Sequence, residues 1–332
     1  MSITGSASIT SASRPTRVAE RAGNDVDGLY WHFHPMSIYK EAYRCGTSLL
    51  NSPHIIETLA RRILERDSFP SCVRCGFQAE RPDIHWLLEQ YVPFDFTNTA
   101  LDDEKVLADM ETQKDLANGR YGDWRLAPRD WGVYQPSHDN YQLPGNCRRW
   151  ISRSLNIGCR FGNLDDRETE KAFAQAAEGK PTLLGIATHD HRDIQPEVEE
   201  LRGLLARASA KYPNVKFKYA EAREAMRAVV YDDKLGEELD LELTLERGED
   251  GKPFMFRVKT LKGEVFGPQP FMSIETKGKR FIHDNMDFGT DLKSWTYTFD
   301  VETVLSDDLA AVGVGANDKF GNTVVKQIRV ND

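Results

Sequence analysis

The chain has 332 residues, of which 40% are hydrophobic and 29% charged, a length and composition that suit a globular protein with two domains. Its formal net charge of −9 and its pI near 5.5 argue against nucleic-acid binding, which needs a basic surface. No stretch approaches the ~20 apolar residues that a membrane-spanning helix requires. We therefore expect no nucleic-acid partner and no membrane span.

Residues 1–23 are rich in Ser, Thr and Ala and carry no acidic residue before Glu20. They lack the apolar core of a secretory signal. An acid-poor, Arg-containing start is also found in transit peptides, but the composition favours a disordered N-terminal segment over 1–23.

Residues 24–232 alternate between strand-like and helix-like segments. The pattern predicts strands at 29–33, 72–77 and 92–96, helices at 55–66 and 82–90, and a long loop over 97–146. It then predicts helix, strand, helix, strand and helix in turn, at 165–178, 182–188, 196–210, 215–219 and 221–229. Two successive β-α units indicate parallel strands with helices packed outside, and so an α/β domain.

The pattern changes over residues 233–332, where apolar and polar residues alternate with a period of two. Leu239, Leu241 and Leu243 alternate with acidic residues, and Trp295 and Tyr297 alternate with threonines. Alternation of this kind between regularly spaced turns is typical of antiparallel sheets. It predicts an all-β, immunoglobulin-like sandwich at the C-terminal end of the chain.

Five cysteines are scattered through the chain: Cys45, Cys72, Cys75, Cys147 and Cys159. The spacing of Cys72 and Cys75 can indicate redox chemistry or half of a zinc site. Since no second pair with that spacing follows, we expect buried free thiols. Reduced cysteines favour a cytoplasmic setting.

Three histidines are the candidates for a chemical site. His32 and His34 are two residues apart, and on a strand that spacing turns both side chains to one face, within reach of one metal ion. His189 directly follows the strand predicted at 182–188, and α/β barrels keep their chemistry at the carboxyl ends of their strands. The alternatives are that the pair on the strand arose by chance and that His189 is a structural histidine.

Four segments, taken in order, resemble the motifs of the polysaccharide deacetylase family of metal-dependent carbohydrate esterases. Residues 24–35 (NDVDGLYWHFHP) look like its histidine motif, and residues 69–76 (FPSCVRCG) look like its arginine motif. Residues 94–98 (FDFTN) fall where its next aspartate occurs, and residues 186–190 (IATHD) look like its final histidine motif. The resemblance implies an incomplete or irregular β/α barrel of the glycoside hydrolase/deacetylase type ahead of the sandwich.

The resemblance also implies a role for each residue in hydrolysing an N-acetyl or similar acyl group on a sugar. His32 and His34 would bind a divalent metal, which the resemblance implies is zinc, and His189 would protonate the leaving amine. Asp95 would orient His189, and Arg74 would position the carboxylate that acts as base. Other interpretations are a helix N-cap for Asp95 and a surface or salt-bridged arginine for Arg74.

Two aromatic residues in the long loop, Trp131 and Tyr134, are candidates for stacking on sugar rings, with core packing as the alternative. The family carries an Asp-Asp motif well before its histidine pair, and we find no counterpart ahead of His32. We therefore expect a metal-dependent carbohydrate deacetylase with impaired activity. The alternatives are a catalytically silent carbohydrate-binding or assembly protein, or an adhesion module formed by the sandwich.

Overall fold

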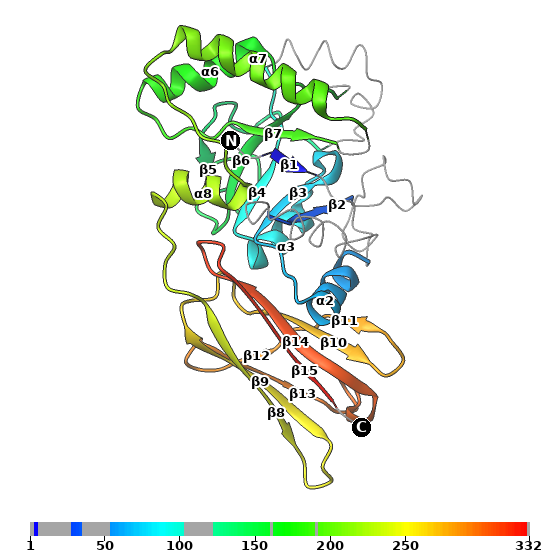
Figure 1. Ribbon diagram of the computed structural model, residues 1–332. Helices are drawn as coiled ribbons and strands as arrows, with labels where there is room; N and C mark the ends of the chain where they lie inside the picture. The colour runs from blue at the N-terminus through cyan, green and yellow to red at the C-terminus, as the bar shows by residue number, and fades with distance from the viewer. Residues whose placement is uncertain are drawn as a thin grey trace. The chain divides into compact units, whose positions relative to one another are not determined.

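The computed structural model describes residues 3–5, 28–34, 54–102, 122–159, 162–189 and 192–330. These residues fall into two units (Figure 1). The first unit holds the described residues within 1–51, 72–86 and 94–234, and the second holds those within 52–71, 87–93 and 235–332. Residues 52–71 and 87–93, which lie inside the α/β domain predicted at 24–232, thus fall in the second unit.

The first unit is built on a mainly parallel sheet of seven strands that curls into a half-barrel. Its strands are β1 (Ile3–Gly5), β2 (Trp31–Phe33), β3 (Cys72–Cys75), β4 (Phe94–Asn98), β5 (Val133–Tyr134), β6 (Trp150–Asn156) and β7 (Gly185–Thr188). The order is β1-β7-β6-β4-β3-β2 with every neighbouring pair parallel, while β5 pairs antiparallel with β6. β3, β4 and β7 are buried along their whole length, as strands of a covered parallel sheet are.

The helices α3, α6, α7 and α8 and the 3-10 turn η2 accompany this sheet, and the boundary between the units runs through α3. Their bounds are Gly76–Gln78 for η2, Pro82–Tyr91 for α3, Asp166–Ala177 for α6, Gln195–Lys211 for α7 and Ala222–Tyr231 for α8. The Asp165 carboxylate caps α6 by accepting from the backbone N–H of Glu168, and Gly179 follows that helix with a positive φ of 76°. The helices predicted in this region are therefore confirmed to within two residues.

Two predictions about strands in the first unit need correction. The segment 215–219 belongs to no strand, and its side chains Phe217 and Tyr219 are about half exposed. A parallel strand there would need an edge of β7, but β6 takes one edge and β1 the other. The strand β6, in contrast, was not predicted, and β1 lies within the segment expected to be disordered, most of which is outside the described residues.

The second unit consists of the helix α2 and two four-stranded antiparallel sheets, with the strand orders β11-β10-β14-β15 and β12-β13-β9-β8. The bounds are His54–Arg66 for α2, Asp240–Arg247 for β8, Pro253–Lys262 for β9, Phe271–Thr276 for β10, Phe281–Ile282 for β11, Asp287–Phe288 for β12, Ser294–Thr298 for β13, Leu309–Asn317 for β14 and Thr323–Arg329 for β15. A 3-10 turn, η3 (Ser306–Asp308), precedes β14.

Both antiparallel sheets turn apolar side chains into one shared core. Phe256 and Trp295 enter it from one sheet, and Ile274 and Val312 enter it from the other. The predicted period-two alternation is the pattern that produces these two inward faces. α2 buries Leu59 and other apolar residues and packs on β10, β11 and β14 of the same unit.

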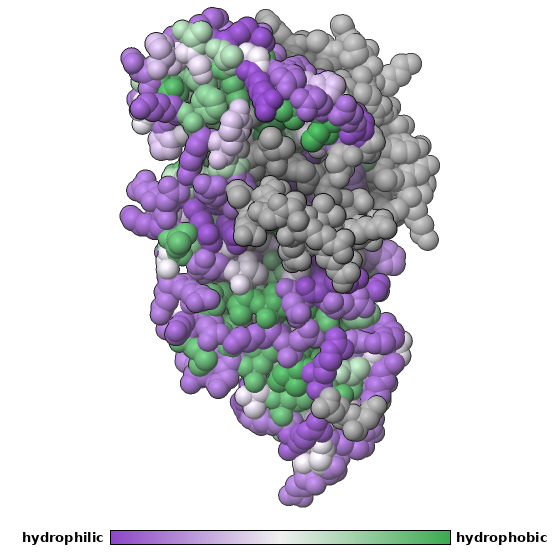
Figure 2. Space-filling model, in the orientation of Figure 1, coloured by the Kyte–Doolittle hydropathy of each residue, from purple (hydrophilic) through white to green (hydrophobic). Residues whose placement is uncertain are grey.

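The face drawn in Figure 2 is mostly hydrophilic, and apolar areas interrupt it over the antiparallel sheets. None of the described helices combines the length and apolar character that crossing a membrane requires.

Candidate functional site

Two imidazoles meet at the carboxyl end of β2. Trp31 and Phe33 are buried on one side of the strand, with ring centroids 4.4 Å apart, so His32 and His34 face the other way. The Nε2 atoms of the two histidines lie 3.1 Å apart, and their rings meet edge to face. The spacing of two residues therefore brings two nitrogen atoms together at one point.

A backbone contact fixes which nitrogen of His32 carries the proton. Nδ1 lies 2.7 Å from the carbonyl oxygen of Arg74, and a carbonyl can only accept. Nδ1 is therefore protonated, and Nε2 keeps its lone pair. Burial, reinforced by the positive charge of Arg74, lowers the pKa of His32 to about 3, so the ring is neutral at pH 7.

His34 rests on the turn that follows β3. Its ring meets Phe77 edge to face at 4.8 Å and also lies against Gly76. A Cβ atom at position 76 would lie 2.5 Å from the His34 ring, much closer than atoms in contact can approach. Glycine is thus required at position 76 to leave room for the imidazole.

The same turn is strained. Phe77 and Gln78 both have positive φ, at 52° and 51°, which non-glycine residues rarely adopt. The turn is held by Gly122, whose N–H donates to the Phe77 carbonyl at 3.0 Å, and by Trp124, whose Nε1 donates to the Gln78 carbonyl at 2.9 Å. Strain of this kind is found preferentially at functional sites.

Arg74 is buried between these groups. Its Nη2 donates to Oδ1 of Asn156 at 2.9 Å and, with the Gln78 amide oriented to satisfy both of its ends, to Oε1 of Gln78 at 2.7 Å. Within the described ranges the structure gives Arg74 no ion pair with a carboxylate. Burial lowers the pKa of Arg74 to about 10 against the opposing effect of nearby thiols and Asp95. Arg74 is therefore neither a surface residue nor, among these residues, a salt-bridged one.

His189 follows β7 and has Cys159 as a neighbour. The Cys159 Sγ lies 3.3 Å from Nδ1 of His189. A positive charge on His189 also contributes to lowering the pKa of His32, which places the two imidazoles within electrostatic reach of each other. Parallel strands bring their carboxyl ends to one edge of a sheet, and His32, Arg74, Asn156 and His189 all lie at such ends.

Asp95 was expected to orient His189 or to cap a helix, but its carboxylate is hydrogen-bonded to Thr97 and Arg149. It lies inside β4 rather than at a helix start, so the N-cap interpretation is wrong. Its carboxylate accepts from the N–H and hydroxyl of Thr97 and, at 3.0 Å, from Nη1 of Arg149. Arg149 also pairs with Glu80 and donates to His85, and all four charged or titratable side chains are buried. The hydrogen bonds of Asp95 thus serve an internal network.

Trp131 and Tyr134 are packed in the core. Trp131 is fully buried, donates from Nε1 to the Glu168 carbonyl and stacks under the guanidinium of Arg153 at 4.5 Å. Tyr134 is 8% exposed and donates to the carbonyl of Tyr141. These contacts match the core-packing alternative, because neither ring offers a free face for a sugar.

His32 and His34 offer two of the three protein ligands that a catalytic zinc ion usually has. Two nitrogen ligands bound tetrahedrally to zinc at about 2.0–2.1 Å lie about 3.3–3.4 Å apart. The His32 and His34 Nε2 atoms lie 3.1 Å apart, slightly closer than that. The Arg74 carbonyl orients His32 as the outer partner of a metal ligand does. Catalytic zinc usually has three protein ligands, and the part of the chain that the structure describes contains no group of three or more His, Cys, Asp or Glu side chains arranged to hold a metal.

Sequence reasoning missed Asn156 and Cys159, and it expected Cys159 to be buried with the other thiols. The four described cysteines are all free; Cys72 and Cys75 are buried, while Cys147 and Cys159 are half-buried. Recognising 150–156 as a strand would have provided the signal, because Asn156 ends that strand and Cys159 follows it.

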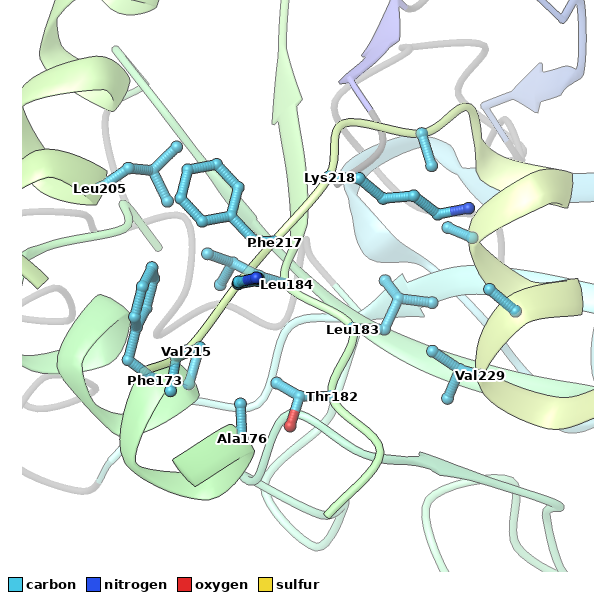
Figure 3. Close-up of a pocket in the computed structure, with 15 residues that line it drawn as sticks. Phe173, Ala176, Thr182, Leu183, Leu184, Leu205, Val215, Phe217, Lys218 and Val229 are labelled. Atoms are coloured by element: carbon cyan, nitrogen blue, oxygen red, sulfur yellow. The ribbon is translucent and has the colours of Figure 1, made fainter. Parts of the chain in front are cut away.

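A cavity of about 230 Å³ lies elsewhere in the first unit, between α6, α7, α8 and the segment 215–220. Figure 3 shows its apolar lining. The ring centroids of Phe173 and Phe217 lie 5.7 Å apart. The Nζ atom of Lys218 donates to Oε1 of Glu224 at 3.1 Å. Leu183 and Leu184 line the cavity just before β7, whereas His189 follows β7. The cavity is therefore at the opposite end of that strand from His189.

Comparisons of the chain with protein-family models, with characterised protein sequences and with solved structures find no match. A functional assignment therefore depends on the residues and their geometry.

Proposed function

We propose that this chain is a metal-dependent hydrolase of the polysaccharide deacetylase type, which removes N-acetyl or similar acyl groups from a carbohydrate. Its two parts would then be an irregular β/α barrel and an immunoglobulin-like sandwich. The observation that carries the proposal is the pair of imidazoles, with the Nε2 atoms of His32 and His34 3.1 Å apart beside a buried arginine, and with burial keeping His32 neutral at pH 7. The nearby position of His189 supports it further.

In this proposal His32 and His34 hold a divalent metal, with zinc as the first candidate. A bound zinc ion would polarise the acyl carbonyl and activate water for attack. His32 is held in the required tautomer by the Arg74 carbonyl. His189, in its imidazolium form, donates a proton to the leaving amine and becomes neutral, a step that general acid catalysis typically accelerates about 10²- to 10⁴-fold. Arg74 would provide the buried positive charge that positions a carboxylate acting as base, although no described carboxylate pairs with it.

The test is acetate release from acetylated chito-oligosaccharides with added zinc or cobalt. We expect slow turnover by the full chain and none by His32→Ala, His34→Ala or His189→Ala. His138→Ala is the matched control, because that imidazole is exposed and pairs with Asp139. Acetate release that survives all three substitutions, or no release by the full chain with either metal, would contradict the proposal.

A catalytically silent carbohydrate-binding protein is the second candidate. Two observations favour it: the Asp95 carboxylate is occupied by Arg149, and Arg74 has no carboxylate partner among the described residues. Calorimetric titration with the same oligosaccharides distinguishes the two candidates. Binding without acetate release, in the presence of zinc or cobalt, would favour the silent protein.

A further inference from the structure

We propose that Cys159 is the positioning residue of His189, its thiol donating to Nδ1 so that the ring proton is kept on Nε2. The geometric basis is the 3.3 Å separation of Sγ and Nδ1, within the range of a hydrogen bond that involves sulfur. Calling His189 catalytic rests on the proposed function, but the thiol–imidazole contact does not.

The backbone of Cys159 is fixed from two sides, which is what a positioning role requires. Its N–H donates to Oδ1 of Asn163 at 3.0 Å, and its carbonyl accepts from Nδ2 of the same side chain at 2.7 Å. One residue earlier, Gly158 has a φ of 66°, and its carbonyl accepts from Arg192 at 2.6 Å. The sulfur atom is therefore held in place by its own loop.

The protonation state of the thiol allows it to be the donor in this hydrogen bond. Burial raises the pKa of Cys159, against the opposing effect of the charge and the hydrogen bond of Arg192 and of the charge of Arg74, while Glu197 adds to the increase. At neutral pH the sulfur therefore carries a proton and can donate it toward Nδ1. An imidazole that accepts at Nδ1 has its own proton on Nε2, on the opposite side of the ring.

A thiol differs from a carboxylate in one testable respect. A carboxylate beside an imidazole favours the charged ring and raises its pKa, typically by about 1–3 units, whereas an uncharged thiol orients the ring without that effect. Asp95, the residue expected from the sequence to hold His189, is instead hydrogen-bonded to Arg149 and Thr97. Cys159 thus takes the orienting role in this chain.

The test is nitrogen NMR of the full chain with labelled histidine, in which chemical shifts report the tautomer of each ring. The His189 signal is identified by its disappearance in His189→Gln. We expect the Nε2-protonated tautomer in the natural chain and in Cys159→Ser, a mixture of tautomers in Cys159→Ala, and no change in the control Cys147→Ala. An Nδ1-protonated ring in the natural chain, or an unchanged tautomer in Cys159→Ala, would overturn the proposal.

Activity provides a second, separable measurement. If the chain releases acetate, Cys159→Ala should lower kcat about 10- to 100-fold with little change in KM, and Cys159→Ser should restore most of it. If no variant releases acetate, the proposed function fails, while the tautomer still decides the role of Cys159. Acetate release with an unaltered tautomer in Cys159→Ala would reject the positioning role and leave the proposed function intact.

Discussion

His32 and Arg74 are partners in register across the parallel strands β2 and β3, and the Nδ1 atom of His32 lies 2.7 Å from the Arg74 carbonyl oxygen. Strand pairing places the Arg74 carbonyl beside the His32 ring, and the ring donates to it from Nδ1. This contact fixes the ring orientation and the tautomer together, because a carbonyl accepts only from a protonated nitrogen. The Nε2 atom that faces His34 is consequently the one with a free lone pair.

The first prediction concerns zinc affinity. We expect the natural chain to bind zinc weakly, because the described residues supply two of the usual three ligands. His32→Ala and His34→Ala should each reduce the affinity at least about tenfold, by removing one of those ligands. Isothermal titration with zinc at pH 7 measures this, with His138→Ala as the exposed control. Equal binding by all four proteins would reject the ligand assignment.

The second prediction concerns the contact between the His34 ring and Gly76. Gly76→Ala should weaken zinc binding to a similar extent without unfolding the chain, because the new Cβ would lie 2.5 Å from the imidazole and must displace it. Gly203→Ala is the control, since position 203 lies in α7 and meets only the flexible end of the Arg207 side chain. Zinc affinity that is identical in both variants would show that the ring does not need this turn to bind metal.

The sequence was sufficient to predict elements whose stability depends on a local pattern. The apolar face of α2 and the alternation Trp295, Tyr297 produced correct predictions, because helical spacing and period two are visible in a single segment. β6 carries the buried Arg153 and Ser152, and their polarity hid a strand whose charges are paired only in three dimensions. Residues 215–219 have the composition of a strand, but both edges of β7 are already taken by β6 and β1, which only the topology reveals.

In the candidate site, too, some features follow from the local sequence and others depend on the complete fold. The shared face of His32 and His34 follows from strand geometry and was predictable. The pairing of Asp95 with Arg149, and of His189 with Cys159, involves residues 54 and 30 positions apart. Nothing in the local sequence around either residue specifies its partner, so those contacts depend on the fold.

The third prediction concerns the buried network around Arg149. Arg149→Met should reduce the free energy of unfolding by about 3–5 kcal/mol, because it leaves the Glu80 and Asp95 carboxylates buried without their cation. Arg125→Met is the control, since that arginine is largely exposed and pairs with a half-exposed Asp123; its loss should cost under about 1 kcal/mol. Urea unfolding at pH 7 provides the measurement, and similar losses in the two variants would contradict the prediction.

The last prediction concerns pH and the buried His85. Its Nδ1 accepts from Nη2 of Arg149 at 2.8 Å, so the ring must be unprotonated there. Burial, assisted by the charge of Arg149, lowers the pKa of His85 from 6.5 to about 4. Below pH 6.5 the unfolded chain therefore binds a proton on this residue that the folded chain does not. As the pH is lowered from 6.5 to about 4, the free energy of unfolding decreases.

The full effect of that protonation is about 3 kcal/mol, and the contribution of His85 is intact only above pH 6.5. Other acidic groups also titrate in this range, so the test compares variants. Urea unfolding at pH 7 and pH 4.5 should show a loss of stability that is about 2–3 kcal/mol larger in the natural chain than in His85→Gln, whose amide oxygen can still accept from Arg149. Equal losses in the natural chain and His85→Gln would mean that His85 is protonated in the folded state, and that its contact with Arg149 is not the one described.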